Sequence, residues 1–160
     1  MLDNYIDLFK KKIEKIENKV RKFKLISLSM LYGKYVWGSE TPEESDCSGT
    51  VCLPLMVMGY KIRVTAERLR QLFKEKAEEY DENEVQAIFY IKEGKAKHVT
   101  PIVGEGMVVN AQGGEEIRLE KALDVIKRYK TRGYEAEIKK LSFADLEGLN
   151  EVYGLDEELS

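Results

Sequence analysis

The apolar residues at the start of the chain recur every three or four positions, from Leu2 through Ile13 to Phe23. This spacing predicts an amphipathic helix from about residue 2 to residue 23. Its other face is basic and carries Lys10, Lys11, Lys12, Lys15, Lys19, Arg21, Lys22 and Lys24. We interpret this face as solvated, opposite an apolar stripe that packs on the domain; an anchor for an anionic surface is the alternative.

The next segments predict a loop and two further helices. Residues 32–45 contain two glycines, a proline and serines, which is typical of a loop. An apolar, helix-like run then follows Cys47 and ends near Gly59, and Pro54 within it is expected to bend or end the helix. Thr65 can cap a helix over roughly 66–80.

After residue 80 the pattern changes to short segments rich in β-formers. They span 85–91, 98–104, 106–112 and 115–119, and Gly-containing turns separate several of them. A helix over about 120–131, a strand over YEAEIKKL and a short helix near Ser142 follow. Helices first and consecutive strands afterwards indicate an α+β fold with an antiparallel sheet.

Length and composition narrow the class of protein. A chain of 160 residues with 43% hydrophobic content predicts one domain with a core of its own. The 26 basic and 29 acidic residues nearly balance, which argues against nucleic-acid binding. No signal peptide is visible, and the apolar run 25–31 is far shorter than the ~20 residues of a membrane span. We therefore expect synthesis in the cytoplasm.

The two cysteines do not predict a disulfide framework or a metal site. A structural zinc site needs four ligands, and the chain adds one histidine to its two cysteines. Cys47 and Cys52 lie five positions apart, or about 140° away from a shared helix face. We assign Cys52 to the core and expect no cofactor.

Cys47 is instead a candidate nucleophile. It lies in the sequence DCSG where the loop gives way to the helix-like run, which predicts a place in the first helical turn near free backbone N–H groups. His98, the only histidine, is the candidate base. If the strands around Glu105–Gly106 pair, Asn110 lies near His98 and can orient its ring. Taken alone, one cysteine and one histidine are more often ordinary buried residues.

The wider context resembles one family. LYGKYVWGS, then DCSGTV, then HVTPIVGEGMVVNAQGG are similar to the NlpC-type cell-wall cysteine peptidases. RVTAERL stands where that family has a PRTA-like segment, and NEVQAIFY stands where it has the strand before the histidine. The resemblance therefore covers roughly residues 25–120. It implies a papain-like fold, with helices packed on a small antiparallel sheet. Residues 1–160 would form this single domain, with 1–24 an added helix and 120–160 a helix–strand–helix extension.

The resemblance also implies an activity and a set of roles. Such enzymes cleave peptide stems of peptidoglycan, commonly between D-glutamate and the following diamino acid, through a thioester acyl-enzyme. The implied catalytic residues are Cys47, His98 and Asn110, and the implied substrate-binding residues are Tyr35, Asp46 and Ser48. The substrate would be peptidoglycan or a soluble muropeptide, and delivery to the wall by a phage or prophage is one route.

Two departures leave alternatives open. Thr100 replaces the family's glycine after His-Val, and Pro101 lacks a backbone donor, which favours an edge strand. An amidase or acyltransferase acting on another small amide or a lipid is one alternative. A non-catalytic binding or phage structural module that keeps the fold is another.

Overall fold

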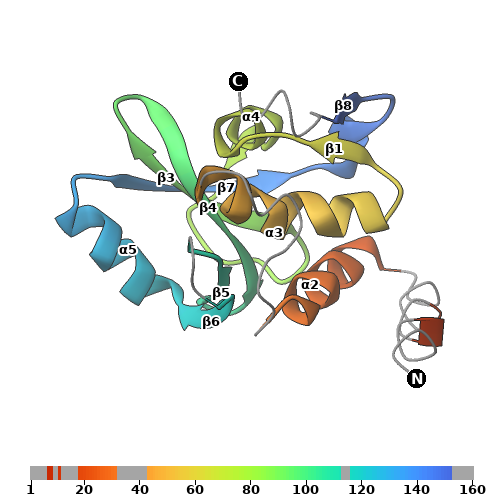
Figure 1. Ribbon diagram of the computed structural model, residues 1–160, viewed down its shortest axis with the longest axis horizontal. Coiled ribbons are helices and arrows are strands. Elements are labelled where there is room, and N and C mark those ends of the chain that lie inside the picture. Colours follow the sequence, from red (N-terminus) through yellow and green to blue (C-terminus); the bar gives the residue numbers. More distant parts are fainter. Residues whose placement is uncertain (1–6, 9–10, 12–17, 32–42, 113–115, 153–160) are drawn as a thin grey trace.

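The computed structural model describes residues 7–8, 11, 18–31, 43–112 and 116–152 (Figure 1). Its helices are α2 (Lys19–Ser29), α3 (Glu43–Val57), α4 (Ala66–Leu72), α5 (Ala122–Thr131) and a 3-10 turn, η1 (Phe143–Leu146). Its strands are β1 (Lys61–Arg63), β2 (Glu75–Lys76), β3 (Val85–Lys92), β4 (Lys95–Gly104), β5 (Met107–Asn110), β6 (Arg118–Lys121), β7 (Glu135–Leu141) and β8 (Asn150–Val152).

The central element of this part of the chain is a six-stranded sheet of order β2-β7-β3-β4-β5-β6. All of its neighbouring strands pair antiparallel. A separate short pair, β1 and β8, is parallel. The predicted α+β class is confirmed, and the segment predicted as a C-terminal extension supplies β7, which pairs with β3 inside the sheet.

Both faces of the sheet are covered by helices. Alternate residues of β3 pack to opposite sides, with Phe89 in the core formed with α2, α3 and α4, and Tyr90 in the core formed with α5. Figure 1 shows α5 set well apart from α2, α3 and α4. Burial on two faces explains why β3 is an almost continuous apolar run in the sequence.

The N-terminal helix prediction is wrong in its boundaries. Asn18 caps a new helix, because its side-chain oxygen accepts hydrogen bonds from the backbone N–H groups of Val20 and Arg21. The helix α2 then runs to Ser29, beyond the predicted end at residue 23. Most of the predicted segment 2–17 lies outside the described residues. No helix among the described residues is long and apolar enough to cross a membrane.

Two other helices also differ from the prediction. The helix α4 has the predicted Thr65 cap but ends at Leu72 rather than near residue 80. The good helix formers that follow include Glu75 and Lys76, which pair with β7 as an edge strand, so sheet pairing overrides propensity. In α3, Pro54 does not end the helix, which continues to Val57.

A β-bulge reshapes β4 immediately before the candidate base. His98 pairs with Tyr90 and Ala96 pairs with Ile91, so Lys97 is an extra residue between them. A bulge of this kind changes the direction of the neighbouring side chains. The predicted edge position of Pro101 is wrong, since β4 lies between β3 and β5; its pairing with β5 begins one residue later, at Ile102.

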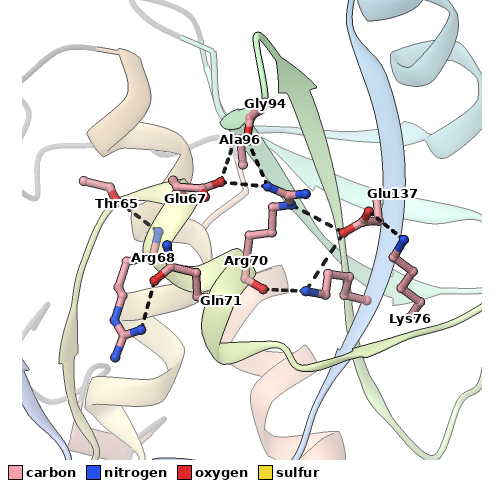
Figure 2. A network of polar contacts seen from close by, with 10 residues as sticks. Thr65, Glu67, Arg68, Arg70, Gln71, Lys76, Gly94, Ala96 and Glu137 are labelled. Carbon is pink, nitrogen blue, oxygen red and sulfur yellow. Dashed lines mark hydrogen bonds and ion pairs between the residues drawn. The ribbon is translucent and has the colours of Figure 1, made fainter.

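A polar network from α4 holds this bulge. The Glu67 carboxylate accepts a hydrogen bond of 2.9 Å from the backbone N–H of Ala96, and Arg70 contacts both Glu67 and the carbonyl of Gly94. Arg70 also reaches Glu137 on β7 (Figure 2). Burial disfavours the charge of Glu67, but the hydrogen bonds from Ala96 and Arg70 outweigh it and lower the pKa of the carboxyl. The network ties α4 to the turn end of the β3–β4 hairpin and to β7.

We expect Glu67→Ala to destabilise the fold by about 1–3 kcal/mol, because the fully buried Ala96 would lose the acceptor for its N–H group. Urea unfolding of the variant and of the wild type measures this difference. Glu78→Ala, at an exposed glutamate, is the control and should change the free energy of unfolding by less than about 0.5 kcal/mol. Equal stabilities of Glu67→Ala and Glu78→Ala would contradict the role of this network.

Candidate active site

His98 and Asn110 meet on adjacent strands. The sequence prediction that β4 and β5 pair through the tight turn at Glu105–Gly106 is confirmed, with Gly106 in the positive-φ region at 69°. The His98 Nε2 and Asn110 Oδ1 atoms lie 2.7 Å apart, and both residues are buried. A short contact to a side-chain amide is the arrangement that fixes the plane of an imidazole ring.

Asn110 is itself held from its amide nitrogen. Asn110 Nδ2 donates a hydrogen bond of 2.7 Å to Glu120 Oε2 on β6 and one of 3.2 Å to Gln112 Oε1. Arg128 on α5 binds both oxygens of Glu120 at 2.9 Å. Gln112 lies two residues after Asn110, on the same side of an ideal strand, and its side-chain oxygen contacts Asn110 Nδ2.

The His98 ring is enclosed by aromatic side chains. It stacks on Tyr129 of α5 with a centroid distance of 4.7 Å and an angle of 10° between the planes, and Tyr90 lies 5.2 Å away. Burial lowers the pKa of His98 to about 4; the Asn110 contact opposes this shift, and the charges of Arg132 and Arg128 add to it. His98 is therefore neutral at pH 7, the state that a general base requires.

The lowered pKa makes a prediction for stability. The pKa of the histidine is 6.5 in the unfolded chain and about 4 in the folded chain. The contribution of the neutral imidazole to the free energy of unfolding is therefore fully present above pH 6.5 and is lost as the pH falls toward 4. We expect a loss on the order of 2 kcal/mol between pH 6.5 and pH 4.5, measured by urea unfolding. The pKa values of the Glu67, Glu120 and Glu151 carboxyls are also lowered, and protonation of these groups affects stability mainly at more acidic pH.

The matched control is His98→Gln, which leaves the chain without a histidine. Its free energy of unfolding should be nearly constant across the same window. A wild type that loses no more stability than His98→Gln would show that the buried imidazole is not held neutral.

Cys47 lies in α3, fully buried, in the core that this helix forms with α2, α4 and the sheet. The predicted place in the first helical turn is wrong, because α3 begins at Glu43 and Cys47 is its fifth residue. Three of the four residues before Cys47, namely Glu43, Glu44 and Asp46, are acidic, a residue type that suits a helix N-terminus. Val99, next to His98, belongs to the same core, and the convergence of Cys47 with His98 and Asn110 stays a prediction.

The remaining predicted site residues have different outcomes. Ser48 is fully buried and accepts a hydrogen bond of 2.9 Å from Arg63, so its place on a pocket wall stays a prediction. Tyr35 and the Asp46 side chain lie outside the described residues. The core assignment of Cys52 is confirmed, since it is fully buried with its sulfur 3.7 Å from the carbonyl oxygen of Val64.

Thr100 has a structural partner that accounts for its presence. Its hydroxyl lies 3.1 Å from the hydroxyl of Tyr90, and both residues are buried. A buried tyrosine hydroxyl needs such a partner. Thr100, which departs from the family pattern, is therefore the hydrogen-bond partner of the Tyr90 hydroxyl, and the Tyr90 ring packs beside His98.

Sequence reasoning missed Glu120, Arg128 and Tyr129. The register could have found the first of these, because Asn110 pairs with Arg118, and Glu120 lies two residues further on the same strand face. The signal that would identify Arg128 and Tyr129 is weaker. They lie on α5, and the packing of that helix against β4 depends on tertiary structure.

The comparison with protein families identifies the class. The fold is a helix-covered antiparallel sheet with a buried cysteine on a helix and a histidine–asparagine pair on two strands. The model of the NlpC/P60 family matches residues 33–139, and the chain belongs to that family. It is a family of cysteine peptidases and amidases that act on cell-wall peptides. No individual curated protein matches the chain.

Proposed function

We propose that this protein is a cysteine hydrolase that cleaves amide bonds in peptidoglycan stem peptides or muropeptides, of the D-glutamyl–diamino acid endopeptidase type. The observation that carries the proposal is the 2.7 Å contact between His98 Nε2 and Asn110 Oδ1 in a chain of the NlpC/P60 family. A buried histidine held by an amide is suited to act as the base beside a thiol.

In the proposed reaction, the Cys47 thiol transfers its proton to His98 and the sulfur attacks the carbonyl carbon of the scissile amide. The protonated imidazole then donates that proton to the leaving amine, and a thioester acyl-enzyme remains. His98 next takes a proton from water, the hydroxide attacks the thioester, and the Cys47 thiolate leaves and regains the proton. Asn110 holds the imidazole plane throughout.

Substrate binding is assigned by the same proposal to Tyr35, Asp46 and Ser48. The Tyr35 hydroxyl would reach the developing oxyanion or a substrate amine. Asp46 would position the loop or the free amine of the substrate, and Ser48 would support the pocket from α3.

The test is mass spectrometry of purified peptidoglycan and of soluble muropeptides after incubation with the wild type and with Cys47→Ala. The expected result is a new pair of fragments from a cut on the carboxyl side of D-glutamate, absent with Cys47→Ala. Cys52→Ala is the matched control and should give the wild-type fragments. Intact stems with the wild type would refute the proposal and favour a non-catalytic module.

A further inference from the structure

We propose that the Glu120–Arg128 ion pair is a positioning device that sets the tautomer of His98 through the Asn110 amide. This inference rests on the proposed function, since a tautomer matters here only for a histidine that acts as a base. It assigns roles to two residues outside the candidate set of cysteine, histidine and asparagine.

The first step is the charge of Glu120. Arg128 binds both carboxylate oxygens at 2.9 Å, and the two N–H groups of one guanidinium form a forked contact that matches the carboxylate. The hydrogen bonds from Arg128, with a further one from Asn110, lower the pKa of Glu120 against the opposing effect of partial burial. Glu120 is therefore ionised near neutral pH, and an ionised carboxylate only accepts hydrogen bonds.

The second step is the orientation of the Asn110 amide. A side chain that faces an acceptor-only carboxylate at 2.7 Å must present its NH₂ group there. The amide oxygen is then turned toward His98, where it lies 2.7 Å from Nε2. Without Glu120, the amide could turn over and present either end to the ring.

The third step is the position of the proton on the imidazole. A neutral ring that contacts an amide oxygen through Nε2 must carry its hydrogen on Nε2. The lone pair is then on Nδ1, the nitrogen that can accept a proton from a thiol. The opposite orientation of Asn110 would place the hydrogen on Nδ1 and block that transfer.

The chain offers a direct readout, because His98 is its only histidine. Long-range ¹H–¹⁵N correlation spectra at pH 7 distinguish the two ring nitrogens of a single labelled histidine. We expect the wild type to show one neutral tautomer with hydrogen on Nε2. Glu120→Ala should show a mixture of the two tautomers, and its kcat should fall at least about tenfold with little change in KM.

Three further variants complete the experiment. Glu120→Gln keeps an oxygen for Asn110 and should retain the Nε2–H tautomer. Glu116→Ala, at an exposed glutamate nearby, is the control and should match the wild type. Arg128→Met removes the anchor of Glu120 and should shift the tautomer as Glu120→Ala does, which keeps the test available if Glu120→Ala does not fold.

A single Nε2–H tautomer in both Glu120→Ala and Arg128→Met would overturn the proposal. The spectra need no substrate, so they separate this proposal from the proposed function. If the two variants shift the tautomer but the wild type cleaves no stem peptide, the proposed hydrolase activity is refuted and the role of the Glu120–Arg128 pair stands.

Discussion

Replacement of His98 by alanine is expected to lower kcat/KM for a stem-peptide substrate by roughly 10³-fold, because a positioned general base contributes ~10²–10⁴-fold. The chain has no second histidine that could replace it. Since His98 is buried between aromatic rings, thermal unfolding must accompany the kinetic assay to show that the variant is folded at the assay temperature.

Lys95→Ala is the matched control, on the exposed start of the same strand, and should keep wild-type turnover. A folded His98→Ala variant that retains more than about a tenth of the wild-type kcat/KM would show that His98 is not the base.

Asn110→Ala should lower kcat by roughly 10²-fold, because the imidazole would lose the acceptor that lies 2.7 Å from Nε2. Gln112→Ala is the comparison that decides the assignment, since Gln112 is a second side-chain amide that lies two residues further on and projects to the same side of an ideal strand. It contacts Asn110 Nδ2 at 3.2 Å, alongside the shorter contact to Glu120, so its loss should cost less than about threefold in kcat. A damaging Gln112→Ala and a silent Asn110→Ala would contradict the geometry of the site.

The strands were more predictable from sequence than the ends of the helices. Alternation and glycine turns located β3, β4, β5 and β7 closely, because strands buried in a sheet carry strong apolar patterns. The predicted helix boundaries were wrong where two local sequence signals disagreed. Asn18 interrupts an apolar stripe that continues past it, and residues 75–76 leave a helical pattern to pair with β7.

The His98–Asn110 pair could be predicted because a tight turn brings two consecutive strands together. The bulge at Lys97 could not be predicted from the sequence, because no glycine or proline marks the position of the extra residue. Glu67, which binds the Ala96 N–H group beside the bulge, lies twenty-nine residues away in sequence. Contacts of this kind depend on how α4 is placed against the hairpin, which no local pattern encodes.

The burial of His98 among aromatic rings also could not be predicted from the sequence. The stacking of Tyr129 on its ring depends on α5 returning over β4, and that packing lowers the pKa of His98 to about 4. The same helix supplies Arg128 to Glu120. One helix from the C-terminal part of the chain thus contacts both the candidate base His98 and Glu120, which binds Asn110.

The most direct test of the central claim, that Cys47 is an activated nucleophile, is the rate at which iodoacetamide labels each cysteine at pH 6, followed by mass spectrometry of peptides. Cys47 and Cys52 are both fully buried, so exposure alone predicts equal rates. We expect Cys47 to be labelled well before Cys52, because the neutral His98 imidazole can take the proton of the Cys47 thiol as the sulfur attacks the reagent, and the chain has no second histidine to do this for Cys52. We expect His98→Ala to remove the difference. Equal, slow labelling of both cysteines in the folded wild type would contradict the account.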